Sequence, residues 1–467
     1  MLGNSENFAT SAVQKAGRWK RAPVARAPDV TVAERRAAMK RLRGRLNVFQ
    51  ATMLDWRELH PYNAVHAVRI EERLAIETLA RAVDDTLEHA GLTGLELDRG
   101  RARYEWHGGP SHAEIERIEA RGDWQQTLAT TFERHLNQAF PVDGRIDPFR
   151  FFAIDAGDAF FVGVAYDHFI AGGDSIIALL NAIADRYAGR NAIDGTMSLY
   201  PPTHRRLLLR HPLRFARGIR RLPAMAASCR RTIRPRYRSL EDGHNAFTFF
   251  MLEPSRYVAL RAAAKAWGVT LNDALLALLL LAQDAQMPER DRSKRRSEFA
   301  VASIMNLRDA HGLDVQRTFG QFLSSFRLSH PVPPGITLQE LAQDVHRATS
   351  RIKRERLYLT TLSAIAIDRM LARFQDRQQR LGVYAKSYPV GAGISSLNVN
   401  ALWRGSGDAA PLYVRGVPTG PASPLVIAVT TSGDTLCAGV SYRTTAFTAD
   451  AVARIRDDMI HRIQGLS

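Results

Sequence analysis

The chain has 467 residues, about three times the length of a common domain, so two large domains or three small ones are expected. Hydrophobic residues make up 45% and charged residues 24% of the chain, which excludes a disordered, collagenous or coiled-coil protein. The longest unbroken apolar run, Ala274 to Ala282, has nine residues, whereas a bilayer crossing needs roughly 20. No membrane-spanning helix is therefore expected.

The chain has two cysteines, Cys229 and Cys437, and neither has a Cys or His beside it at metal-ligand spacing. We therefore expect neither a disulfide framework nor a zinc module, and a reducing compartment fits this use of cysteine. Residues 1–45 contain no apolar stretch of the length that a secretory signal needs. These observations predict a cytoplasmic protein.

The net charge of +17 comes from 64 basic and 47 acidic residues, and it is concentrated in two segments. Residues 15–45 hold eleven Lys or Arg and two acidic residues, and residues 203–238 hold twelve Arg and no acidic residue. The rest of the chain is therefore close to neutral. We expect four segments: a basic N-terminal arm (1–45), an N-terminal lobe (46–195), a basic connector (196–245) and a C-terminal lobe (246–467).

Three explanations compete for the basic charge. Nearly all of it is Arg, which a coding bias explains without any function. Nucleic-acid binding is disfavoured because neither segment interleaves aromatic residues or contains a reading motif, so no specific nucleic-acid partner is expected. The third explanation is a basic amphipathic helix in the connector, since such helices lie on anionic membranes or acidic partners.

The connector separates apolar from basic residues when it is drawn as a helix. Four apolar residues fall within about 40° of one direction, and four arginines lie opposite them: Leu208, Phe215, Ile219 and Leu222 against Arg210, Arg214, Arg217 and Arg221. Pro212, Gly218 and Pro223 interrupt this helix, so a solvated linker helix fits equally well. Peripheral contact with the inner membrane surface through residues 203–238 is one of these two alternatives.

In the N-terminal part, hydrophobic periodicity predicts a mixture of helices and strands. Residues 46–61 (LNVFQATMLDWRELHP) predict a short helix, residues 64–70 an alternating strand, and residues 75–89 a helix. Strands are predicted at 102–106 and 149–154, and the nearly all-apolar segment 159–166 predicts a buried strand. That strand runs into the polar turn DHFIAGGDS and then into a helix with an apolar face.

The C-terminal part predicts a second body of similar composition. A strand at 246–252 and a helix at 255–267 precede a buried helix in GVTLNDALLALLLLAQDA, with Thr270 or Asn272 as its N-cap. A strand at 299–304 leads into MNLRDAHG and FGQFLSSFRL, and a basic helix is predicted at 338–356. Three strand segments, GISSLNVN, SPLVIAVT and LCAGVSYR, and a helix at 449–463 complete the chain.

His168 is the candidate for chemistry, because hydrolase, kinase, dinucleotide and zinc-protease motifs are absent from the sequence. It follows a buried strand and stands in a Gly-containing polar turn, where an imidazole could face a cleft and act as a general base. A hydrogen-bonded structural histidine is the competing interpretation, and on this turn alone it is the stronger one.

Five segments, in their order and spacing, resemble the superfamily of condensation domains and chloramphenicol-acetyltransferase-like acyltransferases, which includes wax ester synthases, alcohol acetyltransferases and polyketide-associated acyltransferases. They are LNVFQATMLDWRELHP, VGVAYDHFIAGGDS, GVTLNDALLALLLLA, IMNLRDAHG with FGQFLSSFRL, and GISSLNVN. The resemblance covers residues 46–465. It implies a two-lobed α/β pseudo-dimer of mixed-sheet domains, with an active-site tunnel between the lobes. It also implies that FGQFLSSFRL is a Gly-containing strand near that tunnel.

The resemblance also implies a reaction and a set of site residues. In the family, the second His of an HHxxxDG motif takes a proton from a hydroxyl or amine acceptor as the acceptor attacks an acyl thioester. No metal or permanently bound cofactor is needed. By position, His168 is that catalytic His, Asp167 replaces the first His, Gly173 is the motif Gly, and Ser175 is the trailing Ser.

The sequence departs from the motif at Gly172, where the family has an Asp that pairs with an Arg matched here by Arg308. A buried Arg without a partner is costly. We therefore predict that Asp174, on a flexible Gly-Gly loop, reaches Arg308 and replaces the missing tie. An N-cap of the following helix is the competing role for Asp174.

Further polar residues are candidates for the tunnel wall: Asp167, Ser175, Asn306, Ser396 and Asn398. Ordinary strand-end or turn hydrogen bonding is the competing interpretation for Asp167, Asn306, Ser396 and Asn398. His60 and His66 have no spacing that distinguishes them from surface residues.

Two functions remain open at this stage. The first is an acyltransferase of lipid or natural-product biosynthesis that uses a coenzyme A or carrier-protein thioester as donor and a hydroxyl or amine as acceptor. The second is a degenerate member of the fold that acts as a binding or scaffold subunit in a biosynthetic complex. Loss of the motif Asp favours the second, whereas retention of His168, Gly173 and Arg308 favours the first.

Overall fold

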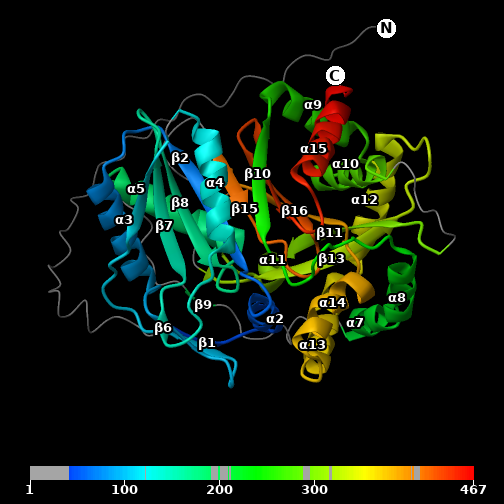
Figure 1. The fold of residues 1–467 in the computed structure, drawn as a ribbon, viewed down its shortest axis with the longest axis horizontal. Coiled ribbons are helices and arrows are strands. Elements are labelled where there is room, and N and C mark those ends of the chain that lie inside the picture. The colour runs from blue at the N-terminus through cyan, green and yellow to red at the C-terminus, as the bar shows by residue number, and fades with distance from the viewer. Residues whose placement is uncertain are drawn as a thin grey trace, which may run out of the picture. The chain divides into compact units, whose positions relative to one another are not determined.

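A computed structural model describes residues 42–120, 122–190, 198–199, 209, 212–287, 295–314, 318–400, 402–403 and 411–466. Most of the predicted basic arm and part of the predicted connector lie outside these residues. Two β-sheets, each covered by helices, organise the described chain into two lobes (Figure 1).

The first lobe is built on a five-stranded sheet with the order β15-β2-β8-β7-β5. Its strands are β2 (Asn63–Ile70), β5 (Ile115–Glu119), β7 (Phe149–Asp155), β8 (Phe160–Asp167) and β15 (Tyr413–Gly416). Helices α3 (Ile76–Ala90) and α5 (Gly173–Tyr187) pack on one face, and α4 (Trp124–Asn137) packs on the other. Strand β15 comes from the C-terminal part of the chain and pairs antiparallel with β2.

The second lobe is built on a six-stranded sheet with the order β10-β17-β16-β14-β11-β13. Its strands are β10 (Asn245–Leu252), β11 (Phe299–Asn306), β13 (Leu323–His330), β14 (Ala392–Asn398), β16 (Leu425–Ser432) and β17 (Thr435–Arg443). Four helices form its core layer: α9 (Pro254–Ala266), α10 (Leu271–Ala285), α12 (Leu338–Arg354) and α15 (Ala449–Gln464). Strands β11, β14 and β16 run parallel.

Smaller elements complete the described fold. One four-stranded sheet has the order β1-β4-β3-β6, and strands β9 and β12 form a pair. The strands are β1 (Leu42–Arg45), β3 (Leu95–Asp98), β4 (Arg103–Trp106), β6 (Arg145–Ile146), β9 (Ser198–Leu199) and β12 (Thr318–Phe319). The remaining helices are α2 (Val48–Arg57), α7 (Pro212–Ile219), α8 (Leu222–Arg231), α11 (Arg308–His311), α13 (Tyr358–Ala372) and α14 (Arg377–Ser387).

Helix α10 shows why the strongest sequence signals were reliable. It is apolar nearly all round and is buried from Asp273 to Gln283, as expected for a core helix. Thr270 is its N-cap, and the Thr270 and Asp273 side chains bond each other's backbone N–H groups in a capping box. The predicted N-cap is therefore Thr270 and not Asn272.

No single described helix is long and apolar enough to cross a membrane. Helices α9 and α10, which are bent by 104° relative to each other, qualify as a pair by length and composition alone. Cys229 and Cys437 are both buried and free.

The segment FGQFLSSFRL is not one strand, contrary to expectation. It is divided between β12, which pairs with β9, and β13, which pairs with β11. Gly320 lies between them with a φ of 145°, and Gln321 is buried. The intervening residues use their polar groups to bond another loop, described below, so they are not available to a ladder.

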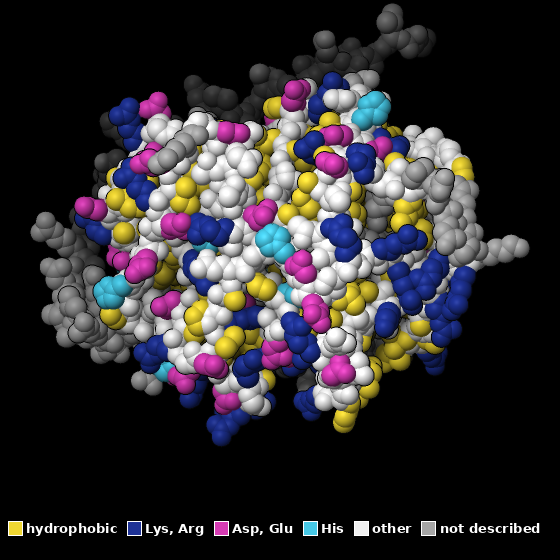
Figure 2. Space-filling model, in the orientation of Figure 1, with side chains coloured by type: hydrophobic (Ala, Val, Ile, Leu, Met, Phe, Trp, Pro, Cys, Tyr) yellow, Lys and Arg dark blue, Asp and Glu magenta, His cyan; other side chains and the backbone are white. Residues whose placement is uncertain are grey.

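The described part of the connector forms two helices, α7 and α8, so its helix is interrupted in the region of Gly218 and Pro223, as the sequence indicates. Helix α7 ends where the N–H groups of Arg220 and Arg221 bond Ala216 and Gly218, and Pro223 stands in the first turn of α8. Leu208 and Arg210, and the side chains of Arg214, Phe215 and Arg217, lie outside the described residues. Figure 2 shows Lys and Arg side chains gathered on the side of the molecule where α8 lies.

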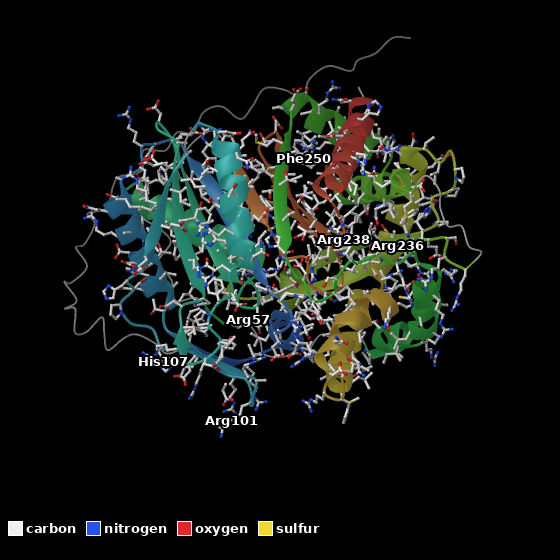
Figure 3. All side chains as sticks on the ribbon, in the orientation of Figure 1. Arg57, Arg101, His107, Arg236, Arg238 and Phe250 are labelled. Atoms are coloured by element: carbon white, nitrogen blue, oxygen red, sulfur yellow. The ribbon has the colours of Figure 1, made fainter. Side chains whose placement is uncertain are left out.

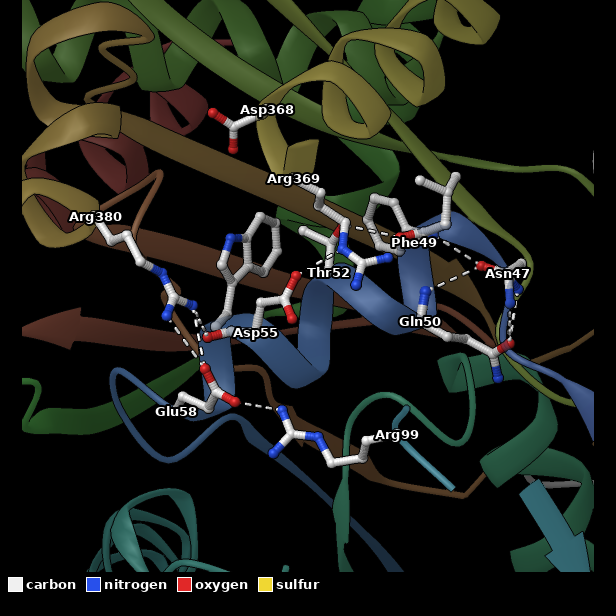
Figure 4. Close-up of polar contacts among 12 residues, drawn as sticks. Asn47, Phe49, Gln50, Thr52, Asp55, Glu58, Arg99, Asp368, Arg369 and Arg380 are labelled. Atoms are coloured by element: carbon white, nitrogen blue, oxygen red, sulfur yellow. Dashed lines mark hydrogen bonds and ion pairs between the residues drawn. The ribbon is translucent and has the colours of Figure 1, made fainter. Parts of the chain in front are cut away.

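Helix α2 bonds to elements from both parts of the chain (Figure 4). Asp55 pairs with Arg369 of α13 at 2.6 Å. Glu58, just after the helix, pairs with Arg380 of α14 at 3.2 Å and with Arg99 of the first lobe at 2.5 Å. These contacts hold α2 against α13 and α14, so the residues of α2 that face inward have a defined position.

The two sheets approach each other at Gly439 of β17. A Cβ atom there would lie 1.9 Å from the carbonyl oxygen of Arg415 in β15, which is backbone and cannot swing away. Only glycine allows this approach.

We predict that Gly439→Ala lowers the free energy of unfolding by roughly 1–3 kcal/mol, because β15 must shift to relieve the overlap. Urea denaturation followed by circular dichroism measures this change. Gly382→Ala, inside α14, is the control, because the nearest atoms lie 3.8 Å away on a flexible Lys386 and the helix gains up to about 1 kcal/mol. Equal unfolding midpoints for the two variants would contradict the prediction.

Candidate active site

The loop that carries His168 joins the buried strand β8 to helix α5. The backbone N–H of His168 donates to the Tyr62 carbonyl at 3.0 Å, and the N–H of Ile170 donates to the Asp167 carbonyl at 3.1 Å. These bonds turn the chain sharply at the end of the strand. Helix α5 then begins at Gly173, five residues after His168.

An ion pair between Asp174 and Arg308 ties this loop to the second lobe. Both residues are buried, with exposed fractions of 3% and 2%. Asn306 donates its side-chain amide to the same carboxylate at 2.9 Å, and Arg308 Nη2 donates to Ser175 Oγ at 2.5 Å. The predicted contact between Asp174 and Arg308 is therefore present, whereas the competing N-cap role is not, since Gly172 is the N-cap and has no side chain.

Gly172 leaves the room that Asp174 uses. A Cβ atom on Gly172 would lie 3.0 Å from Asp174 Oδ1 and 3.2 Å from Gln321 Oε1. A carboxylate at position 172 would therefore crowd and repel the carboxylate of Asp174.

The loop between β12 and β13 makes a second tie to the same turn. Gln321 Nε2 donates to the carbonyls of His168 at 2.8 Å and Ala171 at 3.1 Å. The Gly320 carbonyl accepts from the N–H of Gly172 at 2.9 Å, and Ser175 Oγ lies 3.2 Å from both the N and the O of Gly320. The position of the His168 backbone is thus set from the second lobe.

A cavity of about 180 Å³ lies beside His168. Its walls come from both sheets and from α2, and they include Phe49, Met53, Trp56, Ile304 and Val417. The walls are mainly apolar, with a few polar groups that include Asn306 and Ser396. This composition is typical of a small-molecule binding site. No group of three His, Cys, Asp or Glu residues suited to a metal ion occurs in the described residues.

The His168 imidazole is enclosed by aromatic rings. Its ring centroid lies 5.7 Å from that of Tyr62 and 5.8 Å from that of Tyr166, and the side chain is 8% exposed. Its Nδ1 is buried and has no hydrogen-bond partner among the described residues. Burial lowers the pKa of His168 to about 4, so the imidazole is neutral and able to accept a proton at pH 7.

Solved structures resemble this chain, although no protein-family model and no curated protein sequence matches it. The first condensation domain of the calcium-dependent antibiotic synthetase, with a substrate analogue, has a TM-score of 0.66 and 16% identity over 91% of this chain and 96% of its own. The starter condensation domain of rhizomide synthetase, a mutant in complex with C8-CoA, has a TM-score of 0.63 and 13% identity over 91% of this chain and 94% of its own. An X-domain from teicoplanin biosynthesis, in complex with OxyB, has a TM-score of 0.57 and 15% identity over 91% of this chain and 93% of its own.

This chain has the condensation-domain fold. Matches over 91% of this chain at these TM-scores establish the fold, and because the identities are low they establish the fold alone. The two-lobed α/β architecture predicted from the sequence is thus confirmed.

Asp167, which the sequence resemblance places at the first motif position, does not line the cavity. Its carboxylate forms a buried ion pair with Arg57 of α2, which is labelled in Figure 3. Arg57 also donates to the Phe140 carbonyl at 2.8 Å. The prediction that Asp167 lines the tunnel is therefore wrong, because its side chain is held by α2 instead.

The other predicted wall residues divide into two groups. Asn306 and Ser396 line the cavity, and Ser396 Oγ donates to the side chain of Asn272 at 3.0 Å. Ser175 lies behind the wall, bonded to Gly320 and Arg308. Asn398 is exposed and accepts from the N–H of Asn400 at 3.0 Å. The prediction that Ser175 and Asn398 line the cavity is therefore wrong.

His66 is a cavity residue and not a surface residue, contrary to expectation. It is fully buried on β2, with Nδ1 2.8 Å from Tyr413 Oη and Nε2 3.3 Å from Tyr166 Oη. Burial lowers its pKa well below the usual value, so it too is neutral. His60 is also buried, and its Nε2 accepts from Arg443 at 3.1 Å.

Arg415, Gln321 and His66 are site residues that sequence reasoning missed. Arg415 stands opposite His66 in the pairing of β15 with β2, a pairing between segments more than 300 residues apart. A four-residue strand carries almost no periodic signal. The position of His66 did indicate burial, since it lies on the same face of the strand as apolar residues two positions away on either side.

We predict that the Asp174–Arg308 pair couples strongly in a double-mutant cycle. Asp174→Asn and Arg308→Met should each lower the free energy of unfolding by about 3–5 kcal/mol, because each leaves a buried charge alone. The double variant should lose much less than the sum of the two. Urea denaturation measures all three values.

An exposed ion pair provides the control for this cycle. Arg73 and Asp158 lie 3.1 Å apart, but their side chains are 84% and 93% exposed. Their coupling should be at most about 1 kcal/mol. Additive effects at Asp174 and Arg308 would mean that the tie does not stabilise the loop.

Proposed function

We propose that this chain transfers an acyl group from a thioester, carried by coenzyme A or a carrier protein, to a hydroxyl or amine acceptor. The observation that carries the proposal is a neutral, buried imidazole, His168, that lines an apolar cavity between two lobes. The rhizomide starter domain was solved with C8-CoA, an acyl thioester, and shares the fold.

In the proposed reaction His168 acts as the general base. The acceptor's O–H or N–H proton passes to Nε2, since Nδ1 is enclosed by protein. The acceptor oxygen or nitrogen then forms a bond to the thioester carbonyl carbon, giving a tetrahedral intermediate. Collapse of the intermediate breaks the C–S bond, and the imidazolium returns its proton to the departing thiolate. The products are an ester or amide and a free thiol.

Asp174 and Arg308 are positioning residues in this mechanism. Both oxygens of the Asp174 carboxylate are occupied, one by Asn306 and Arg308 and the other by Arg308 and the Ser175 N–H. The carboxylate is therefore not free to receive a proton from His168. It holds the loop in the geometry that presents the imidazole to the cavity.

A second candidate is a binding or scaffold role without turnover. The observation that favours it is the replacement of two motif positions: Asp167 points to Arg57 and Gly172 has no side chain. The X-domain structure contains a second protein, OxyB, which is an example of the fold in a protein complex. Carrier-protein binding is compatible with either candidate.

Peripheral membrane contact by the connector stays a prediction. In the described part of the connector, Leu213 on α7 is 80% exposed. Outside the connector, Phe374 is 85% exposed just after α13, and α13 contacts α7. Exposed apolar residues beside arginines are typical of an interfacial helix.

We predict that His168→Ala lowers kcat/KM for thiol release by about 10²- to 10⁴-fold, the usual contribution of a general base. The assay offers acyl-CoA thioesters of graded length and a panel of alcohol and amine acceptors. His112→Ala, which changes an exposed histidine, is the control. Thiol release that His168→Ala leaves unchanged would remove His168 as the base. A total lack of turnover in a folded wild-type protein would favour the binding role.

The pH dependence of the same reaction gives a separate prediction. A base with a pKa of about 4 is largely unprotonated above pH 5. With an alcohol acceptor, which does not titrate in this range, kcat/KM should therefore stay level from pH 8 down to about pH 5 and fall only below that. A disulfide reagent that reports thiols in acid, such as 4,4′-dithiodipyridine, allows the measurement. An acid limb near pH 6.5 would show that the imidazole is not enclosed.

A further inference from the structure

A buried arginine, Arg415, lines the cavity without a carboxylate bonded to it. It lies on β15 with an exposed fraction of 1%. Its Nε donates to Thr430 Oγ1 at 2.9 Å, and its Nη2 donates to the carbonyls of Ser395 and Val429, both at 2.7 Å. All three acceptors are neutral, so they fix the side chain without neutralising its charge.

The remaining nitrogen, Nη1, has no hydrogen-bond partner in the part of the chain that the structure describes. Its position is known relative to the first residue of α5. A Cβ atom on Gly173 would lie 3.4 Å from Arg415 Nη1 and 3.2 Å from His66 Cε1. Because Gly173, His66 and Arg415 all line the cavity, Nη1 is placed at its wall.

The charges around the cavity leave an excess of one positive charge. Asp174 is the only carboxylate among the described residues that line it, and its oxygens are bonded by Arg308, Asn306 and the Ser175 N–H. His66 and His168 are neutral. Burial lowers the pKa of Arg415 to about 10, so it remains protonated at pH 7. Arg308 and Asp174 cancel, and the charge of Arg415 is left over.

The N-terminus of α5 adds to this positive field. The helix has 15 residues, and its N-cap, Gly172, offers no side-chain acceptor. Gly173 and Asp174, in its first turn, both line the cavity. Helix N-termini carry a partial positive charge that favours anions.

We propose that the cavity binds a carboxylate group at Arg415 Nη1, beside the N-terminus of α5, so that one of the two substrates is a carboxylate-bearing acyl donor or acceptor. This inference rests on the proposed function only in naming the cavity's ligand a substrate. A carboxylate fits better than a phosphate, because a monoanion balances the single excess charge. In addition, only one guanidinium nitrogen is free to bind it.

Paired probes test the proposal by isothermal titration calorimetry. Octanoate and octanamide have nearly the same shape, and their chains suit the apolar wall, but only octanoate is charged. The wild-type protein should bind octanoate at least ten-fold more tightly than octanamide at pH 7.5. Equal dissociation constants, or no binding of octanoate, would overturn the proposal.

Two substitutions at Leu397 provide a matched pair that leaves Arg415 in place. Leu397 Cδ1 would lie 2.5 Å from a Cβ atom on Gly173, so Leu397 and Arg415 Nη1 are close to the same point. Leu397→Glu should supply an internal carboxylate and abolish the preference for octanoate, whereas Leu397→Gln should retain it. If both variants keep the preference, or if both lose it, Arg415 is not the binding group.

Arg415→Met is the complementary variant. It should bind the two probes within two-fold of each other, provided that circular dichroism shows a folded protein, and a retained ten-fold preference would overturn the proposal. Where Arg415→Met does not fold, the wild-type and Leu397 measurements decide the matter.

These binding measurements do not depend on turnover. If the proposed function is wrong, thiol release will be insensitive to His168→Ala while the protein still binds octanoate more tightly than octanamide. If the carboxylate site is wrong, the two probes will bind equally while His168→Ala still lowers thiol release.

Discussion

The buried ion pair between Asp174 and Arg308 is the interaction on which the geometry of the candidate site depends. It joins the first turn of α5, in one lobe, to the end of β11 and the start of α11, in the other. A buried pair of this kind adds little net stability compared with apolar residues, but breaking it is expensive. Its main effect is therefore to exclude other positions of the loop, and His168 lies only six residues before Asp174.

Burial gives the site its electrostatic character. His66 and His168 are neutral because a charged imidazole would be poorly solvated between aromatic rings. Arg415 remains charged because a guanidinium loses its proton only at much higher pH. The cavity thus combines a neutral base, an apolar wall and one uncompensated cation. The proposed transfer reaction, with a carboxylate-bearing substrate, would use all three features.

The sequence allowed the elements with continuous local signals to be predicted. Strand β8 and helix α10 are long and apolar, and a polar turn or a capping residue marks an end of each. The Asp174–Arg308 contact was also predictable, because a buried Arg needs a counter-charge and a Gly-Gly loop can deliver one from an unusual position. The same contact explains the glycine at position 172, since a side chain there would crowd the Asp174 carboxylate.

The rest of the site depends on pairings between distant segments. The role of Arg415 follows from the pairing of β15 with β2, and that of Gln321 follows from a loop that interrupts an apparently continuous strand. The prediction for Asp167 was wrong because the side chain of a strand-end residue can turn toward the cavity or away from it. Only the position of Arg57 on α2 decides between these two directions. Local periodicity contains no information on these contacts.

The protonation state of His168 reports whether the two lobes enclose a neutral imidazole, and it does so more directly than any reaction rate. Long-range ¹H–¹⁵N spectra of ¹⁵N-labelled protein, recorded between pH 3.5 and 8, follow each imidazole, and His168→Gln identifies the His168 signals. The His168 signals should change only near pH 4, and Arg308→Met should move this change toward higher pH. A transition near pH 6.5 in the wild-type protein would contradict the enclosure of the imidazole.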